Sequence, residues 1–128
     1  MKNLFLKYWK SILFSLLILY LSFAKPDNFK ELPTVKFADK WAHYVIYIVY
    51  GLTLIYDYYK ANQTKFLTLK FVSICFVFPI LMGGLIEILQ ERYFYPRSAE
   101  WLDWSCDIVG ILTAWLVAWL LRLILKRK

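Results

Sequence analysis

The sequence predicts an all-α membrane protein, a polytopic transmembrane bundle of four helices with the N- and C-termini both cytoplasmic. Hydrophobic residues make up 61% of the 128 residues, well above the roughly 45–50% of soluble domains. The chain also contains four apolar runs, and its basic residues are divided unequally between the two sides of such a bundle. No period repeats, so we expect one domain over 1–128.

The apolar runs define the helices. They hold 14 or 16 residues each and cover 11–24, 41–56, 71–86 and 108–121. A helix that crosses a bilayer needs about 20 residues, so each helix must take in flanking polar residues. We therefore expect helices near 5–24, 39–58, 67–91 and 102–125.

The basic residues orient this bundle. If all four helices span, the side with both termini carries ten of the 16 basic residues and one acid, Asp57. The opposite side carries six basic residues and eight acids. Because lysine and arginine accumulate in cytoplasmic loops, the first side should be cytoplasmic and the acidic side should face outward.

The first apolar run has a second interpretation. Lysines, a short apolar core and Ser22-Phe23-Ala24 also resemble a signal peptide with a small-residue cleavage site. Tyr8 and Trp9 at the inner boundary favour a retained helix, since aromatic residues are typical of membrane interfaces. Cleavage after Ala24 would leave three helices, and this alternative stays open.

The second expected helix begins with polar residues. Asp39, Lys40, His43 and Tyr47 are spaced to project from adjacent parts of one helix face near the outer surface. Taken alone, Asp39 is an ordinary capping acid, and His43 is an interfacial residue bonded to the backbone. A site role for either residue therefore depends on what the other helices bring near them.

The third expected helix combines a packing face with a polar end. Pro79 should kink it, and Gly83-Gly84 should admit a close neighbour. Glu87 follows one turn later and shares a face with Gln90. In the next loop Arg97 can return over the helix ends, where a guanidinium can pair with a carboxylate or phosphate through two bonds.

The fourth expected helix carries one stripe, made by Asp103, Asp107, Gly110 and Ala114. Gly110 with Ala114 is a small-xxx-small packing face, which should press the stripe against another helix. Asp103 could equally be an N-terminal capping acid, whereas Asp107 lies too deep for that role.

Topology brings these polar residues to the same side and depth, because the second helix begins where the third ends and the fourth begins. Ionisable groups at the edge of membrane helices indicate a functional site. We expect an outward-opening, charge-compensated pocket with Gln90 as an uncharged donor. Its charged members are Lys40, His43 and Arg97 against Asp39, Glu87, Asp103 and Asp107.

Composition excludes several ligand classes. Cys75 and Cys106 share no ligand spacing, and one histidine leaves no thiol and imidazole cluster for zinc. Glu87, Asp103 and Asp107 with His43 could hold a divalent ion, but a salt-bridge network is favoured, so no metal or other cofactor is expected. The net charge of +7 does not predict nucleic-acid binding, because the basic residues flank apolar segments.

Polar motifs of the last three expected helices carry a family resemblance. They are Asp39-Lys40-Trp41-Ala42-His43 with Tyr47, Glu87-Ile88-Leu89-Gln90, Arg97, and Asp103-Trp104-Ser105-Cys106-Asp107-Ile108-Val109-Gly110. In order and spacing they resemble the VanZ-like family of small bacterial membrane proteins, over roughly 39–110 and beyond. The family usually has asparagine where this chain has Asp107. The resemblance implies a multi-pass protein of the bacterial cytoplasmic membrane, in a family named for a member associated with low-level teicoplanin resistance, and supplies no established reaction.

Three functions fit these residues. The favoured one is a site that binds or processes an anionic envelope lipid or lipid-linked cell-wall precursor. His43 would act as acid or base, oriented by Asp39 or Glu87, while Lys40 and Arg97 hold a phosphate or carboxylate. The alternative is a non-catalytic scaffold that presents its outer loops to a membrane-bound cell-wall enzyme. A proton or ion pathway is less favoured, because no charged relay continues toward the cytoplasmic half.

Overall fold

The structure is a computed structural model that describes residues 3–23, 38–62, 68–94 and 99–127. Within these ranges all regular structure is helical, and the predicted all-α class is confirmed. In chain order the helices are α1 (Leu4–Lys7), α2 (Trp9–Phe23), α3 (Ala38–Asn62), α4 (Leu69–Val72), the π-helical η2 (Ser73–Val77), α5 (Phe78–Tyr93) and α6 (Trp101–Lys126).

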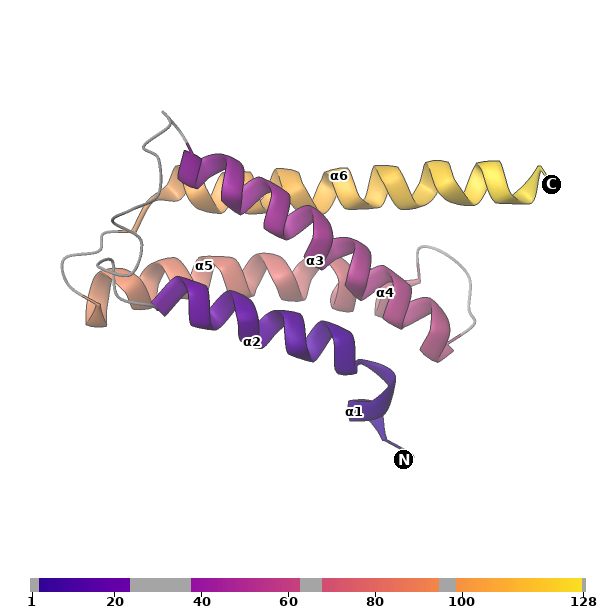
Figure 1. The fold of residues 1–128 in the computed structure, drawn as a ribbon, viewed down its shortest axis with the longest axis horizontal. Helices are drawn as coiled ribbons and strands as arrows, with labels where there is room; N and C mark the ends of the chain where they lie inside the picture. Colours follow the sequence, from indigo (N-terminus) through magenta and orange to yellow (C-terminus); the bar gives the residue numbers. More distant parts are fainter. Residues whose placement is uncertain (1–2, 24–37, 63–67, 95–98, 128) are drawn as a thin grey trace.

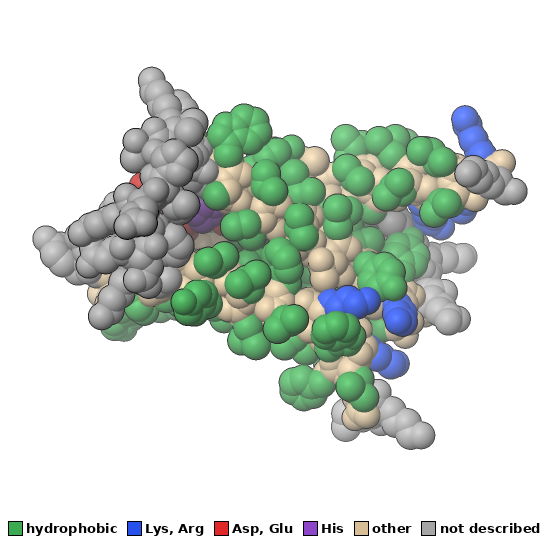
Figure 2. All heavy atoms as spheres, viewed as in Figure 1, with side chains coloured by type: hydrophobic (Ala, Val, Ile, Leu, Met, Phe, Trp, Pro, Cys, Tyr) green, Lys and Arg blue, Asp and Glu red, His purple; other side chains and the backbone are tan. Residues whose placement is uncertain are grey.

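The helices pack side by side along one long axis (Figure 1). α3 packs most extensively on α6, α2 packs on α3 and α5, and α5 packs on α6. At one end of the molecule α2 ends, α3 begins, α5 ends and α6 begins; we call this the site end (Figure 1). The opposite end, where lysine and arginine side chains gather in Figure 2, is the basic end.

Two stretches are long and apolar enough to cross a bilayer. They are Leu69–Tyr93, which joins α4, η2 and α5, and Trp101–Lys126, which is α6. α2 is apolar but has only 15 residues. Large hydrophobic side chains such as Leu81, Leu116 and Trp119 are exposed along the sides of the helices, which Figure 2 shows as a largely apolar surface. These features indicate association with a membrane.

Glycine and alanine set the close approach of α3 to α6. A Cβ added at Gly110 would lie 2.7 Å from the carbonyl oxygen of Tyr44 and 2.9 Å from the Cβ of Tyr47. One turn further along α6, Ala114 faces Gly51 of α3, where an added Cβ would lie 2.7 Å from the Ala114 Cβ. The predicted small-residue packing face is confirmed, and its partner is α3.

The irregularity predicted at Pro79 takes the form of the π-helical turn η2, which ends two residues before it. Proline has no backbone N–H, so the carbonyl of Cys75 cannot receive the usual helical bond from Pro79. The indole Nε1 of Trp115 in α6 donates to that carbonyl at 3.4 Å instead. This bond ties the irregular part of the third predicted helix to α6.

The first predicted helix is divided in two. It breaks at Tyr8 into α1 and α2, so that the first turn of α2 needs new acceptors for its N–H groups. Asp57 of α3 supplies one. Its Oδ2 accepts from the backbone N–H of Ser11 at 2.9 Å and from the Ser11 hydroxyl at 2.8 Å.

Candidate functional site

At the site end, a histidine of α3 is bonded to a buried aspartate of α6. His43 Nδ1 lies 2.8 Å from Asp107 Oδ1, and Nε2 lies 3.6 Å from Asp103 Oδ2. An ionised carboxylate can only accept, so this bond places the imidazole hydrogen on Nδ1 and leaves Nε2 toward Asp103. Asp107 is 1% exposed, whereas the His43 side chain is 28% exposed and can be reached from outside.

A second set of contacts joins the beginnings of α3 and α6. The Lys40 ammonium pairs with the carboxylate of Glu100 and lies 2.9 Å from Asp103 Oδ1. The Lys40 side chain is only 16% exposed, so this pair is partly shielded from water. Lys40 was expected to meet an anionic ligand, and in the structure its ammonium already pairs with two carboxylates, those of Glu100 and Asp103.

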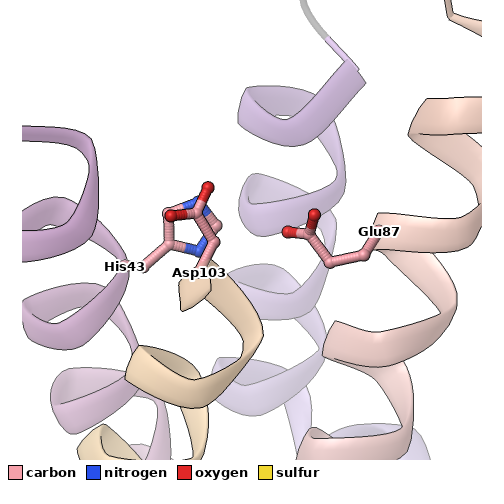
Figure 3. A group of neighbouring side chains, drawn as sticks. All are labelled: His43, Glu87 and Asp103. Carbon is pink, nitrogen blue, oxygen red and sulfur yellow. The ribbon is translucent and has the colours of Figure 1, made fainter. Parts of the chain in front are cut away.

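Glu87 closes the site from α5. It is 2% exposed, and its Oε2 accepts from the backbone N–H of Glu100 at 2.9 Å. Glu100 is the N-cap residue of α6, so Glu87 satisfies an N–H group at the start of that helix. Figure 3 shows Glu87 pointing toward His43 and Asp103, and one ligand atom from each of the three side chains lies within 4.8 Å of the others.

Two glycines of α5 allow side chains of α3 and α6 to approach that helix closely. A Cβ added at Gly83 would lie 2.9 Å from Asp107 Oδ2 and 3.1 Å from the hydroxyl of Tyr47, which is 2% exposed. At Gly84 it would lie 3.2 Å from the indole of Trp104. The predicted close approach at Gly83-Gly84 is confirmed, and the neighbours are polar side chains of the site and the indole.

Three predicted site residues are not found beside His43, Glu87 and Asp103 in the described part of the chain. The Gln90 Nε2 donates to the carbonyl of Ser22 at 2.6 Å, so its amide ties α5 to the end of α2. Asp39 lies in the first turn of α3, and its side chain lies outside the described part of the chain. Arg97 also lies outside the described residues.

No protein-family model, curated protein or solved structure matches the chain. The resemblance to VanZ-like proteins therefore stays a prediction. The candidate site is the place where side chains from α3, α5 and α6 meet at one end of the molecule.

A buried polar group in the basic half escaped the sequence prediction. Asp57 was counted as the lone acid of the basic side, but it is 2% exposed and bonded to Ser11. Nearby, the Ser15 hydroxyl lies 2.6 Å from the hydroxyl of the fully buried Tyr50. Serines four residues apart on an apolar helix were the available signal, because such hydroxyls need a partner when buried.

Proposed function

We propose that this chain is a four-span protein of the bacterial cytoplasmic membrane whose site end faces outward and binds or processes an anionic envelope lipid or lipid-linked cell-wall precursor. The observation that carries the proposal is the bond between His43 and Asp107, set among ionisable groups of three helices in an otherwise apolar molecule. Groups of this kind are costly near hydrocarbon, and they are typical of ligand or proton-transfer sites.

The topology of the proposal follows from helix length and charge. α3 has 25 residues and is about 38 Å long, enough to cross a bilayer, while α2 needs the flanking α1 to reach the interface. Lysine and arginine gather at the basic end, which the positive-inside rule assigns to the cytoplasm (Figure 2). The site end then faces the outer leaflet, where envelope lipids and cell-wall precursors are exposed.

The chemistry available to the site is acid–base chemistry at one atom. With its hydrogen on Nδ1 held by Asp107, His43 presents Nε2 as the atom that can accept or return a proton. Asp107 stabilises the positive ring that results. A bound head group would supply the atom that gives or receives this proton.

Lipid analysis tests the proposal. The protein is purified in a mild detergent, and the lipids that accompany it are identified by mass spectrometry for the wild type, His43→Ala and Glu87→Gln. The matched control is Glu91→Gln, because Glu91 is an exposed glutamate one turn further along α5. We expect an anionic lipid that the first two variants lose and the control retains. The same lipids in every variant would refute the proposal.

The resemblance to VanZ-like proteins supplies a cellular test. Expression in a teicoplanin-susceptible bacterium should raise the inhibitory concentration of teicoplanin, and His43→Ala should abolish the rise at equal protein level. Unchanged protection by that variant would separate any resistance from the site.

A scaffold function is the second candidate, and one observation favours it. Lys40 pairs with Glu100 and Asp103, and Glu87 holds the backbone of Glu100, so much of the polarity of the site serves to join helices. Such a network fixes helix register and could present the outer surface to a membrane-bound cell-wall enzyme. His43→Asn keeps an N–H donor for Asp107 but has no group that accepts a proton, so a scaffold should tolerate it. Loss of protection in this variant, at equal protein level, would argue against a scaffold.

A further inference from the structure

Negative charge exceeds positive charge among the described groups of the site. Four carboxylates lie there, against one ammonium and one imidazole; they belong to Glu87, Glu100, Asp103 and Asp107. Even with a protonated ring, two negative charges remain. Three of these residues are at most 8% exposed, and buried carboxylates require a counter-charge. These described groups, taken by themselves, would repel an anionic head group unless a cation accompanied it.

Three of these side chains share a second property: each has one polar atom fixed by a neighbour outside the group. His43 Nδ1 is held by Asp107. Glu87 Oε2 accepts from the N–H of Glu100, and Asp103 Oδ1 forms an ion pair with the Lys40 ammonium at 2.9 Å but accepts no hydrogen bond from the described residues. Metal sites are built in this way, because an outer hydrogen bond orients each ligand and sets the tautomer of the histidine.

We propose that His43, Glu87 and Asp103 bind a divalent transition-metal ion, with Asp107 as the outer carboxylate that orients the imidazole. The inference rests on the binding part of the proposed function, since the ion offers an anionic head group a positive centre to bind. With a neutral imidazole, the ion also reduces the net charge of the four carboxylates and the Lys40 ammonium from −3 to −1. A Nε2 atom that coordinates the ion no longer accepts a proton, so the ion would replace the acid–base role of His43. The ion's charge of +2 would offset the charges of its two carboxylate ligands, Glu87 and Asp103, at a site close to hydrocarbon. A donor set with one nitrogen and two oxygens favours zinc, manganese or iron over calcium and magnesium.

The distances fit such an ion. His43 Nε2 and Asp103 Oδ2 are 3.6 Å apart, longer than a good hydrogen bond. Two ligands of a tetrahedral ion with bonds of about 2.0–2.1 Å are about 3.4 Å apart, so this pair already has the required spacing. The remaining separations, none above 4.8 Å, close through small movements of the Glu87 side chain. Three protein ligands leave at least one position for a phosphate or carboxylate oxygen.

Metal titration of the purified full chain tests the inference. The protein carries a streptavidin-binding tag, since a polyhistidine tag would bind the probe, and is first stripped with a chelator. Zn²⁺ is then titrated by calorimetry. We expect one ion per chain, at least tenfold weaker binding for Glu87→Gln, and 10- to 100-fold weaker binding for Asp107→Asn. Glu91→Gln should match the wild type. The absence of a one-to-one site, or equal binding by Glu87→Gln, would overturn the inference.

A gain-of-signal variant guards against loss of fold. With Co²⁺ as the probe, His43→Cys should add a thiolate-to-cobalt absorption band that the wild type lacks, although the wild type contains Cys75 and Cys106. A bound Co²⁺ without that band would exclude His43 as a ligand. The two proposals fail separately: an accompanying lipid without a metal site refutes only the metal, and a metal site without a lipid that depends on it refutes the proposed function.

Discussion

The substitution Gly110→Ala tests the close packing of α3 on α6. The added Cβ would lie 2.7 Å from a backbone oxygen of α3, and ordinary contact begins at 3.4 Å. The helices must therefore separate locally by about 0.7 Å, and overpacking of this kind costs about 1–3 kcal/mol. Alanine also favours a helix over glycine by about 1 kcal/mol, so the net loss of stability should be about 0–2 kcal/mol.

The matched control is Gly84→Ala, which gains the same helix propensity. Its Cβ would meet only the Trp104 side chain, at 3.2 Å, and a side chain can give way where a backbone cannot. We expect Gly84→Ala to be at least as stable as the wild type and about 1–3 kcal/mol more stable than Gly110→Ala. Unfolding in mixed micelles with increasing sodium dodecyl sulfate, followed by circular dichroism, measures both.

The site offers a second measurement on the same variant. Asp107 lies almost one turn before Gly110, so a separation of about 0.7 Å at the seam should also lengthen its 2.8 Å bond to His43. Equal stability of the two alanine variants, with an unchanged imidazole nuclear magnetic resonance signal of His43, would refute the close approach of α3 to α6.

Three further substitutions test single bonds by the same unfolding assay. Asp57→Ala leaves the two Ser11 donors without their acceptor and should lower the free energy of unfolding by about 1–3 kcal/mol. The backbone amide of Ser11 should then exchange its hydrogen faster, and an unchanged exchange rate would contradict the assigned bond. Gln90→Ala should cost about 1 kcal/mol and loosen the end of α2, which cross-linking between engineered cysteines on α2 and α5 would report as a broader range of distances. Trp104→Phe removes one hydrogen bond to a carbonyl of α5 and should lower the free energy of unfolding by about 0.5–1.5 kcal/mol. Trp101 is exposed, so Trp101→Phe should cost little. Equal losses of stability in the two variants would show that the Trp104 bond does not contribute.

Hydrophobic patterning made much of this fold predictable. The apolar runs located the helices, and the order of their ends predicted that His43, Glu87, Asp103 and Asp107 would share one end of the molecule. Chain direction alone decides which helix ends meet when neighbouring helices run antiparallel. This is why the meeting of these side chains could be expected without any knowledge of their contacts.

Other features depended on partners that sequence spacing does not reveal. Gln90 shares a helix face with Glu87, yet its amide reaches the end of α2, because the position of α2 decides which polar group it meets. The burial of Asp57 follows from the break at Tyr8, which exposes N–H groups that need an acceptor. The indole of Trp115, which donates to the carbonyl of Cys75, likewise lies on another helix, so sequence spacing does not reveal this bond.

The contact between Glu87 and the N-cap of α6 links the parts of the site mechanically. The Glu87 carboxylate accepts a hydrogen bond from the backbone N–H of Glu100, and the Glu100 carboxylate forms an ion pair with Lys40 at the start of α3. A continuous series of polar contacts therefore joins α5 to α6 and α6 to α3. A ligand that moves Glu87 would therefore strain its bond to Glu100 and, through Glu100, the ion pair with Lys40, so a change at α5 would reach α6 and α3.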